Sequence, residues 1–218
     1  MWNKRKLVGL LSNALIVLLV VMAVIKMVNT RSTVLAGMAL EGLKYFTVLS
    51  NLFEGLIALA SVIYFLFFDY KKYPRLLGIM KLVSTTAVAL TLVTVFVYLT
   101  PLIGLALLLE DANFYMHLVI PLLAIIEFIF LEQEKVLIYR HNLYAVIPML
   151  VYGVGYLSNV AAHNAFYGNL MYDWYGFGMF GPAIGVLMFV VMMLMTFAIS
   201  NGLYFAYRTR IKAKKKER

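Results

Sequence analysis

Cysteine is absent from this sequence of 218 residues, and charged residues make up only 13% of it. The lack of cysteine excludes disulfides, thiolate nucleophiles and thiolate metal sites. The shortage of charge leaves too little polar surface to cover a soluble domain, because 64% of the residues are hydrophobic and the mean hydropathy is +0.90. No polar block is long enough to form a second domain. These absences predict one membrane domain over residues 1–218.

Long apolar stretches take up most of the chain. A helix needs roughly 20 apolar residues to cross the hydrocarbon core of a bilayer, and six stretches come close to or exceed that length. The first of them is longer than the apolar part of a secretory signal, and no small-residue cleavage site follows it. The sequence therefore predicts an all-α polytopic membrane bundle of six transmembrane helices, over residues 7–28, 43–68, 79–99, 114–131, 143–160 and 180–207.

Positive charge is distributed unevenly between the connections of these spans. Sixteen Lys and Arg residues, Lys81 among them, fall on one side, and only Lys26, Arg31 and Lys44 fall on the other. By the positive-inside rule, both termini are expected in the cytoplasm. The net charge of +9 then reflects topology and attraction to anionic lipids, so the expected partner is the membrane and not nucleic acid. Short loops and small size favour a bacterial source, so the expected location is the bacterial cytoplasmic membrane. In a eukaryote, the expected location is the ER membrane.

Two reactive side chains interrupt the apolar runs at matching positions. Thr47 lies six residues after Glu41, and His117 lies six residues after Asp111. Both spans run inward from the outer side in the predicted topology, so the hydroxyl and the imidazole are expected at one depth, about 9 Å inside by helical rise. Such a pair has the chemistry of a nucleophile and its general base. The same topology places His141 on the opposite side of the membrane.

Polar residues also form stripes along the predicted helices. In the second span, Ser50, Asn51 and Glu54 follow Thr47 at offsets of three, four and seven residues. A carboxyl in lipid costs several kcal/mol, so this stripe must face the bundle interior. The third and fifth spans carry similar stripes, namely Ser84, Thr91, Thr94 and Tyr98, and Tyr152, Tyr156, Asn159 and His163. We expect an internal cavity that opens toward the outer leaflet.

A family resemblance rests on motifs in several of these spans. The second span carries Phe46-Thr47 followed by Ser50-Asn51, and the fourth combines Asn113, His117, Pro121 and Glu127. Further motifs are Gly155-Tyr156, His163, Trp174-Tyr175-Gly176-Phe177 and Gly181-Pro182. In this order they resemble the androgen-induced and androgen-dependent tissue-factor-pathway-inhibitor-regulating proteins and their bacterial relatives. Ser50 stands where eukaryotic members of that family have an acidic residue.

The resemblance implies an intramembrane hydrolase of fatty acid esters of hydroxy fatty acids, which uses no cofactor or metal. It implies that Thr47 is the nucleophile and His117 its base, with a lipid substrate taken from the bilayer. Asn51 and Asn113 are candidate donors to the oxyanion. The residues expected to line the pocket or to orient the catalytic pair are Ser50, Asn51, Glu54, Asn113, Tyr156, Asn159 and His163.

Other functions remain open on the sequence alone. An acyltransferase would use the same residues, with an alcohol replacing water as the acyl acceptor. His117 and His163 could be the two ligands of a haem, or could form a metal site with Asp173. A transporter or scaffold would use the polar stripes as a permeation path and would depend on Glu54 and Glu127. A threonine in a membrane helix can also simply bond the carbonyl one turn back.

Overall fold

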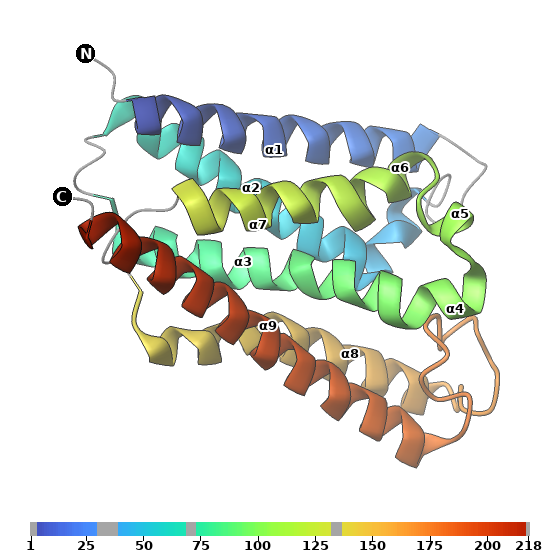
Figure 1. Ribbon diagram of the computed structural model, residues 1–218. Helices are drawn as coiled ribbons and strands as arrows, with labels where there is room; N and C mark the ends of the chain where they lie inside the picture. Colours follow the sequence, from blue (N-terminus) through green and yellow to red (C-terminus); the bar gives the residue numbers. More distant parts are fainter. Residues whose placement is uncertain (1–3, 30–38, 69–72, 132–136, 217–218) are drawn as a thin grey trace.

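The computed structural model describes residues 4–29, 39–68, 73–131 and 137–216, which form helices joined by turns and contain no strand (Figure 1). Six helices in these ranges are long and apolar enough to cross a membrane. They are Lys6–Asn29, Phe46–Phe67, Arg75–Leu99, Asp111–Leu131, Tyr139–Ala162 and Pro182–Ala213. The predicted all-α bundle of six spans is confirmed, and the chain has the architecture of a multi-pass membrane protein.

Several of the spans are built from more than one helical element. The first three contain α1 (Lys4–Asn29), α2 (Phe46–Phe67), and α3 (Arg75–Thr94) with its extension η3 (Val95–Leu99). The fourth contains α6 (Asp111–Phe114), η4 (Tyr115–Val119) and α7 (Ile120–Leu131). The last two contain η5 (Tyr139–Val146) with α8 (Ile147–Ala162), and α9 (Pro182–Lys216). Short elements in the connections are η1 (Ala39–Lys44), α4 (Thr100–Ile103) and α5 (Leu105–Leu108).

Several helices extend beyond their predicted ends, among them α3 at its start and α9 at its end. α3 begins at Arg75, directly after Pro74, and so starts four residues earlier than expected. Proline suits this place because a helix start does not use its backbone N–H. α9 has 35 residues and continues through the basic tail to Lys216. Lysine and arginine are good helix formers, so the tail prolongs the helix after the apolar stretch ends.

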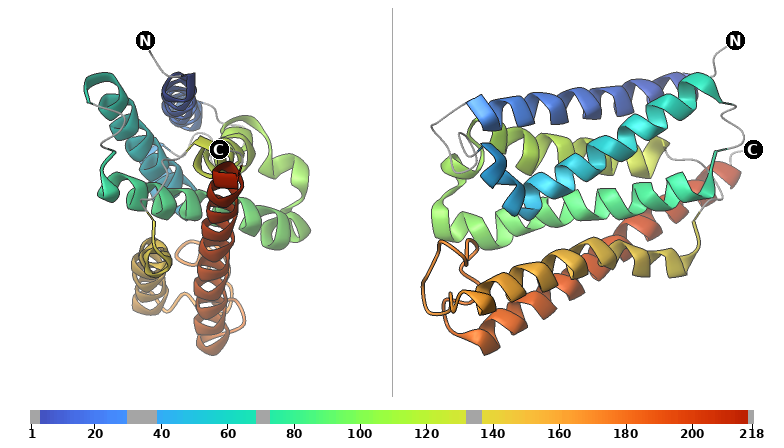
Figure 2. Two further views of the ribbon diagram at one scale, coloured as in Figure 1. Left: turned by 60° about the vertical axis from the view of Figure 1, so that its left-hand side comes forward. Right: turned by 180° about the vertical axis from the view of Figure 1, so that it is seen from behind.

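The centre of the bundle is α3. It packs against α2, α7, α8 and α9, as well as η5, and its residues 81–90 are all buried. Figure 2 shows it between a group formed by α1, α2 and α7 and a pair formed by α8 and α9. Small polar residues allow close helix packing in membranes, which suits the buried run Ser84-Thr85-Thr86 in this helix.

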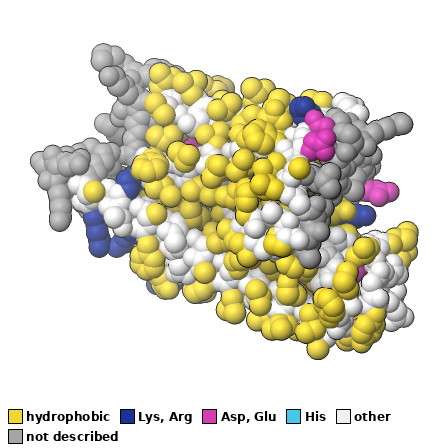
Figure 3. Space-filling view, turned by 45° about the vertical axis from the view of Figure 1, so that its right-hand side comes forward, with side chains coloured by type: hydrophobic (Ala, Val, Ile, Leu, Met, Phe, Trp, Pro, Cys, Tyr) yellow, Lys and Arg dark blue, Asp and Glu magenta, His cyan; other side chains and the backbone are white. Residues whose placement is uncertain are grey.

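The outer surface of the bundle matches a lipid environment. Figure 3 shows hydrophobic side chains spread over the side of the molecule, while the charged side chains gather toward its two ends. α1 begins and α9 ends at the same end of the bundle (Figure 1). This arrangement agrees with an even number of spans.

Lys81 corrects one part of the topology prediction. It was counted among the charges of a cytoplasmic connection, but it lies in the second turn of α3 and is fully buried. The earlier start of α3 at Arg75 moves it inside the bundle. Removing it from the count leaves the charge asymmetry between the two sides intact.

Candidate functional site

Thr47 lies in the first turn of α2, which is held by a distant loop. Tyr45 precedes the helix in an extended conformation and makes no side-chain cap. Instead, the backbone N–H of Phe46 donates to the hydroxyl of Tyr175 at 3.0 Å. An unpaired N–H at a helix start is thereby satisfied, and Thr47 is left 7% exposed next to this contact.

Tyr175 belongs to the aromatic connection between α8 and α9. Trp174 donates from Nε1 to the Tyr152 hydroxyl at 3.0 Å, and that hydroxyl donates to the Lys44 carbonyl at 2.7 Å. The ring of Tyr175 packs at 6.4 Å from that of Tyr152. Burial raises the pKa of Tyr175 to about 12, because a phenolate is poorly solvated there. These contacts fix the connection against the first turn of α2.

Asp173 organises the same connection. It is fully buried, and it accepts hydrogen bonds from the Tyr156 hydroxyl and, at 2.9 Å, from the backbone N–H of Gly178. Tyr156 was predicted to line the substrate pocket or orient the catalytic pair, and its hydroxyl is engaged with this carboxyl. Asp173 therefore stabilises the fold of the loop.

A small cavity of about 20 Å³ adjoins Thr47. Hydroxyl-bearing residues of α2 and α3 contribute to its wall, namely Thr47, Thr91 and Thr94. A space of this size holds about one water molecule when two or more polar groups face it. The other lining residues are Phe46, Val95, Leu99, Met149, Tyr152, Tyr175, Phe177 and Met192.

A much larger apolar pocket of about 640 Å³ lies on the same side of α2. Phe46 and Tyr152 line both cavities, so they separate the large one from the small one. Ser50 lines the large pocket; its Oγ lies 3.0 Å from the Thr91 Oγ1 and donates to the Thr47 carbonyl at 3.0 Å. The remaining lining residues are Leu49, Phe53, Leu76, Ile79, Met80, Val83, Ala87, Tyr144, Ile147, Pro148 and Val151.

His117 lies in η4, a π-helical turn between α6 and α7. It is 4% exposed, and its Nδ1 lies 2.6 Å from the carbonyl oxygen of Leu108. A carbonyl can only accept, so Nδ1 carries the hydrogen, and Nε2 of the neutral ring keeps its lone pair. Single π turns inside α-helices often occur at functional sites. The histidine is thus fixed in the tautomer that a general base needs.

Asn51 joins the Thr47 turn to the His117 turn. Its Nδ2 donates to the Thr47 carbonyl at 2.7 Å and to the Met116 carbonyl at 3.0 Å. No hydrogen bond between the Thr47 hydroxyl and the His117 ring occurs among the described residues. Both amide hydrogens of Asn51 are engaged, so in this conformation it positions two helices and does not serve as an oxyanion donor.

The remaining predicted site residues lie in two places. Asn113 is fully buried in α6, one turn before His117. Asn159 donates to the Tyr172 carbonyl at 2.9 Å. His163 is exposed, stacks on Tyr172 with ring centroids 3.9 Å apart, and bonds the Asn159 carbonyl. Asn159 and His163 therefore support the loop end of α8 and are not brought to the Thr47 turn.

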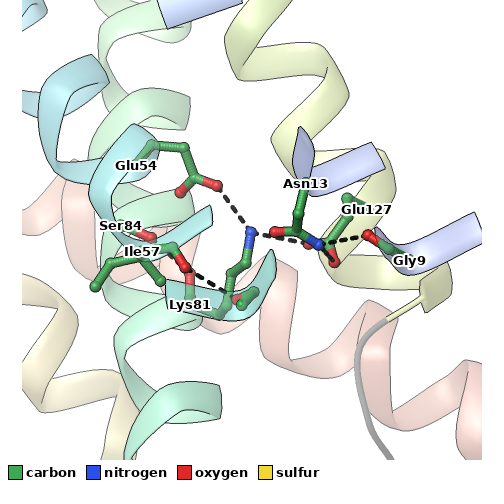
Figure 4. Close-up of polar contacts among 8 residues, drawn as sticks. Gly9, Asn13, Glu54, Ile57, Lys81, Ser84 and Glu127 are labelled. Carbon is green, nitrogen blue, oxygen red and sulfur yellow. Dashed lines mark hydrogen bonds and ion pairs between the residues drawn. The ribbon is translucent and has the colours of Figure 1, made fainter. Parts of the chain in front are cut away.

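Glu54, the last predicted member of the α2 stripe, belongs to a buried charged cluster (Figure 4). The Lys81 Nζ lies 3.1 Å from Glu54 Oε1 and 3.2 Å from Glu127 Oε2. Asn13 of α1 donates from Nδ2 to Glu127 Oε1 at 2.8 Å. Lys81 and Asn13 are functional candidates that the sequence reasoning missed. The available signal was that Lys81 precedes Ser84 by three residues and so extends the polar stripe of α3.

Metal ligands do not gather in the parts of the chain that the structure describes: no group of three or more His, Asp or Glu side chains there could hold an ion. Neither His117 nor His163 contacts the other or Asp173 through the interactions described above. Comparison with known proteins leaves the family open. No family model matches the chain, and no curated protein or solved structure is similar to it at a significant level.

Proposed function

We propose that this protein is an intramembrane hydrolase of lipid esters, with Thr47 as nucleophile and His117 as general base. The observation that supports it is the Asn51 bridge, which ties the Thr47 turn and the His117 turn together in the buried interior. The fixed tautomer of His117 and the apolar pocket lined by Phe46 and Ser50, on either side of Thr47 in the sequence, add to this support. The family resemblance points to the same pair of residues.

The proposed reaction has two steps. His117 Nε2 takes the proton of the Thr47 hydroxyl while Oγ1 attacks the ester carbonyl carbon, and the alcohol then leaves with that proton. In the second step, His117 takes a proton from water and the resulting hydroxide attacks the acyl-threonine. The bond to Oγ1 then breaks, His117 returns the proton to Oγ1, and the free acid leaves. The small cavity beside Thr47 has room for this water. Catalytic hydrogen bonds often close only when substrate binds.

The large pocket supports a lipid as substrate. Its 640 Å³ falls within the range of small-molecule sites. Its α3 wall runs from Leu76 to Ala87, which is about 16 Å by helical rise. An acyl chain lying along this wall would bring its ester to Ser50, beside the first turn of α2. Because an acyl chain is already dissolved in the bilayer, its sideways movement into the pocket costs little free energy.

The proposal includes an orientation of the chain in the membrane. Both ends of the chain lie in the cytoplasm, and Thr47 and His117 lie in the outer half of a bacterial cytoplasmic membrane, or of the ER membrane in a eukaryote. The charge asymmetry of the connections supports this orientation.

An acyltransferase would differ from the proposed hydrolase only in the acyl acceptor. The two activities are distinguished by the product, which is a free acid for the hydrolase and a new ester for the acyltransferase.

Labelling with a fluorophosphonate probe in native membranes tests the proposal. Wild type and Thr47→Ser are expected to be labelled, and Thr47→Ala and His117→Ala are expected to lose both labelling and release of fatty acid from lipid esters. Ser50→Ala is the matched control, because it removes the neighbouring hydroxyl on the large pocket. Inserted and folded Thr47→Ala that keeps wild-type activity, or Ser50→Ala that alone abolishes it, would falsify the assignment.

A further inference from the structure

Three titratable side chains meet in the buried interior of the bundle, toward the end where α3 begins and α7 ends. Glu54 of α2 and Lys81 of α3 are fully buried, and Glu127 of α7 is 2% exposed. The lysine nitrogen lies between the two carboxyl groups, at 3.1 Å from Glu54 and 3.2 Å from Glu127 (Figure 4). Three helices are therefore joined through one ammonium group.

The charges of this cluster do not balance when every group is ionised. One ammonium faces two carboxylates, which leaves one net negative charge in a dry interior. An uncompensated buried charge is strongly unfavourable, and a group in this position takes up a proton instead. Asn13 of α1 supplies a neutral amide and so does not remove the excess. A single proton would make the cluster neutral.

Hydrogen bonding distinguishes the two carboxyl groups. Glu127 Oε1 accepts a hydrogen bond from Asn13 Nδ2 at 2.8 Å, and its Oε2 forms an ion pair with Lys81 at 3.2 Å. Glu54 meets Lys81 at Oε1, and its buried Oε2 receives no hydrogen bond from the described residues. Donors stabilise a carboxylate, so Glu127 is the better place for the negative charge. The Ser84 hydroxyl neighbours the Glu54 carboxyl and can accept from a protonated Oε2.

Among the described residues, the other helices around the cluster bring no further ion pair to Glu54. The charged groups that act on it are Lys81, which favours its ionised form, and Glu127, which opposes it. By helical rise, Lys6 of α1 lies about 10 Å before Asn13, and His117 lies about 15 Å before Glu127. Tyr207 of α9 packs against Phe128 of α7.

We propose that this cluster is a proton-binding site, which holds one exchangeable proton on Glu54 between the ammonium of Lys81 and the hydroxyl of Ser84. The neutral state then consists of a protonated Glu54, an ionised Lys81 and an ionised Glu127. Loss of the proton leaves two carboxylates facing one lysine and weakens the packing of α2 on α3 and α7. This inference is independent of the proposed hydrolase, because none of its groups touches Thr47 or His117 through a described hydrogen bond.

Infrared spectroscopy of the purified, detergent-solubilised full-length protein tests the location of the proton. At neutral pH in sodium-free buffer, wild type is expected to show the carbonyl band of a protonated carboxyl. Glu54→Gln and Glu127→Gln are both expected to lose the band, because each leaves one carboxylate facing one ammonium, whereas the exposed control Glu110→Gln keeps it. Glu54→Asp is expected to shift the band, and Glu127→Asp is expected to leave it in place. Absence of the band from wild type overturns the proposal. A shift of the band in Glu127→Asp but not in Glu54→Asp overturns the assignment to Glu54.

Thermal unfolding as a function of pH gives a second readout. In the unfolded chain, a glutamate loses its proton near pH 4. The folded cluster is proposed to keep this proton at higher pH, so the folded state binds more protons than the unfolded one. The stability of the fold therefore falls as pH rises. Relative to Glu54→Gln, the wild-type Tm is expected to fall by roughly 3 to 5 °C per pH unit above about 5 until the folded protein also releases the proton. Equal pH profiles for wild type and Glu54→Gln would contradict a titratable proton. A wild-type Tm that rises with sodium ion at alkaline pH, and not in Glu54→Gln, would show a metal cation in its place.

Discussion

The side-chain amide of Asn51 donates to the backbone carbonyl of Met116 at 3.0 Å, from the second membrane-spanning helix to the fourth. The same nitrogen donates within its own helix to the Thr47 carbonyl. One fully buried side chain thus fixes the distance between the turn that carries the proposed nucleophile and the turn that carries the proposed base. Its role is one of position, since it has no hydrogen left for a substrate in this conformation.

Replacement of this bridge should weaken both the fold and the activity. Asn51→Ala leaves the buried Met116 carbonyl without its donor, so we expect a loss of about 1 to 3 kcal/mol in unfolding free energy. Ester hydrolysis should fall by at least roughly tenfold, because a misplaced catalytic group is costly. Thermal melting and lipid-ester turnover measure the two effects. Ser61→Ala is the control, because its hydroxyl bonds only the Ile57 carbonyl of its own helix; equal effects from both variants would contradict the bridging role.

The buried lysine should be needed only while its carboxyl partners remain. Lys81→Met leaves Glu127 and Glu54 without their cation, so we expect about 3 to 5 kcal/mol of destabilisation and poor recovery from membranes. Adding Glu54→Gln and Glu127→Gln in the same chain removes the charges and should restore most of the stability. Detergent-stable yield and Tm are the measurements. A triple variant as unstable as Lys81→Met would show that the lysine acts through packing rather than charge.

The contact between Tyr175 and the Phe46 N–H predicts that the protein loses stability at alkaline pH. The pKa of this phenol is raised to about 12 in the folded protein, above the usual value of about 10. As pH rises, the Tyr175 phenol therefore loses its proton in the unfolded chain before it does so in the folded protein. The stability that the neutral phenol contributes is fully present below pH 10 and is lost between about pH 10 and 12. Tyr175→Phe removes that dependence and costs about 1 to 3 kcal/mol at neutral pH through the unpaired N–H. Melting curves from pH 7 to 12 test this, with the exposed Tyr139→Phe as control.

Filling the large pocket should change which esters are hydrolysed. Met80 lines the pocket on α3, and Met80→Trp shortens the space for a chain while leaving the Thr47 turn untouched. We expect kcat/KM to fall by roughly tenfold or more for long-chain esters, or about 1.4 kcal/mol, and to change little for short-chain ones. Leu56→Trp adds the same bulk on the lipid-facing side of α2, at a residue that is 64% exposed. Parallel losses for both chain lengths would argue against an acyl pocket.

The parts of the fold that depend on hydropathy were predictable. Six apolar stretches of sufficient length are visible in the sequence, and the α2 stripe of Thr47, Ser50, Asn51 and Glu54 is buried as its helical spacing indicates. The start of α3 was not predicted, although Pro74 is a typical residue just before a helix. Reading that proline as the helix start would have placed Lys81 in the second turn of the helix instead of at its first residues.

Contacts between distant segments were beyond the reach of sequence patterns. The hydrogen bond from Phe46 to Tyr175 joins residues 129 positions apart, and the one from Asn13 to Glu127 joins residues 114 positions apart. The π turn of η4 adds a further obstacle, because a regular 3.6-residue period misplaces the faces of residues on either side of it. The direction of His117 relative to Glu127 therefore could not be obtained from spacing.

The length of α9 has a consequence for the membrane around it. Its stretch without charged residues, 182–207, measures about 39 Å by helical rise, whereas the hydrocarbon core of a bilayer is about 30 Å thick. Figure 1 shows α9 crossing the other helices obliquely, and such a tilt is how a long helix relieves the mismatch. The angle of α9 against α3 and α8 is thus coupled to bilayer thickness, which makes lipid chain length a determinant of how this helix packs.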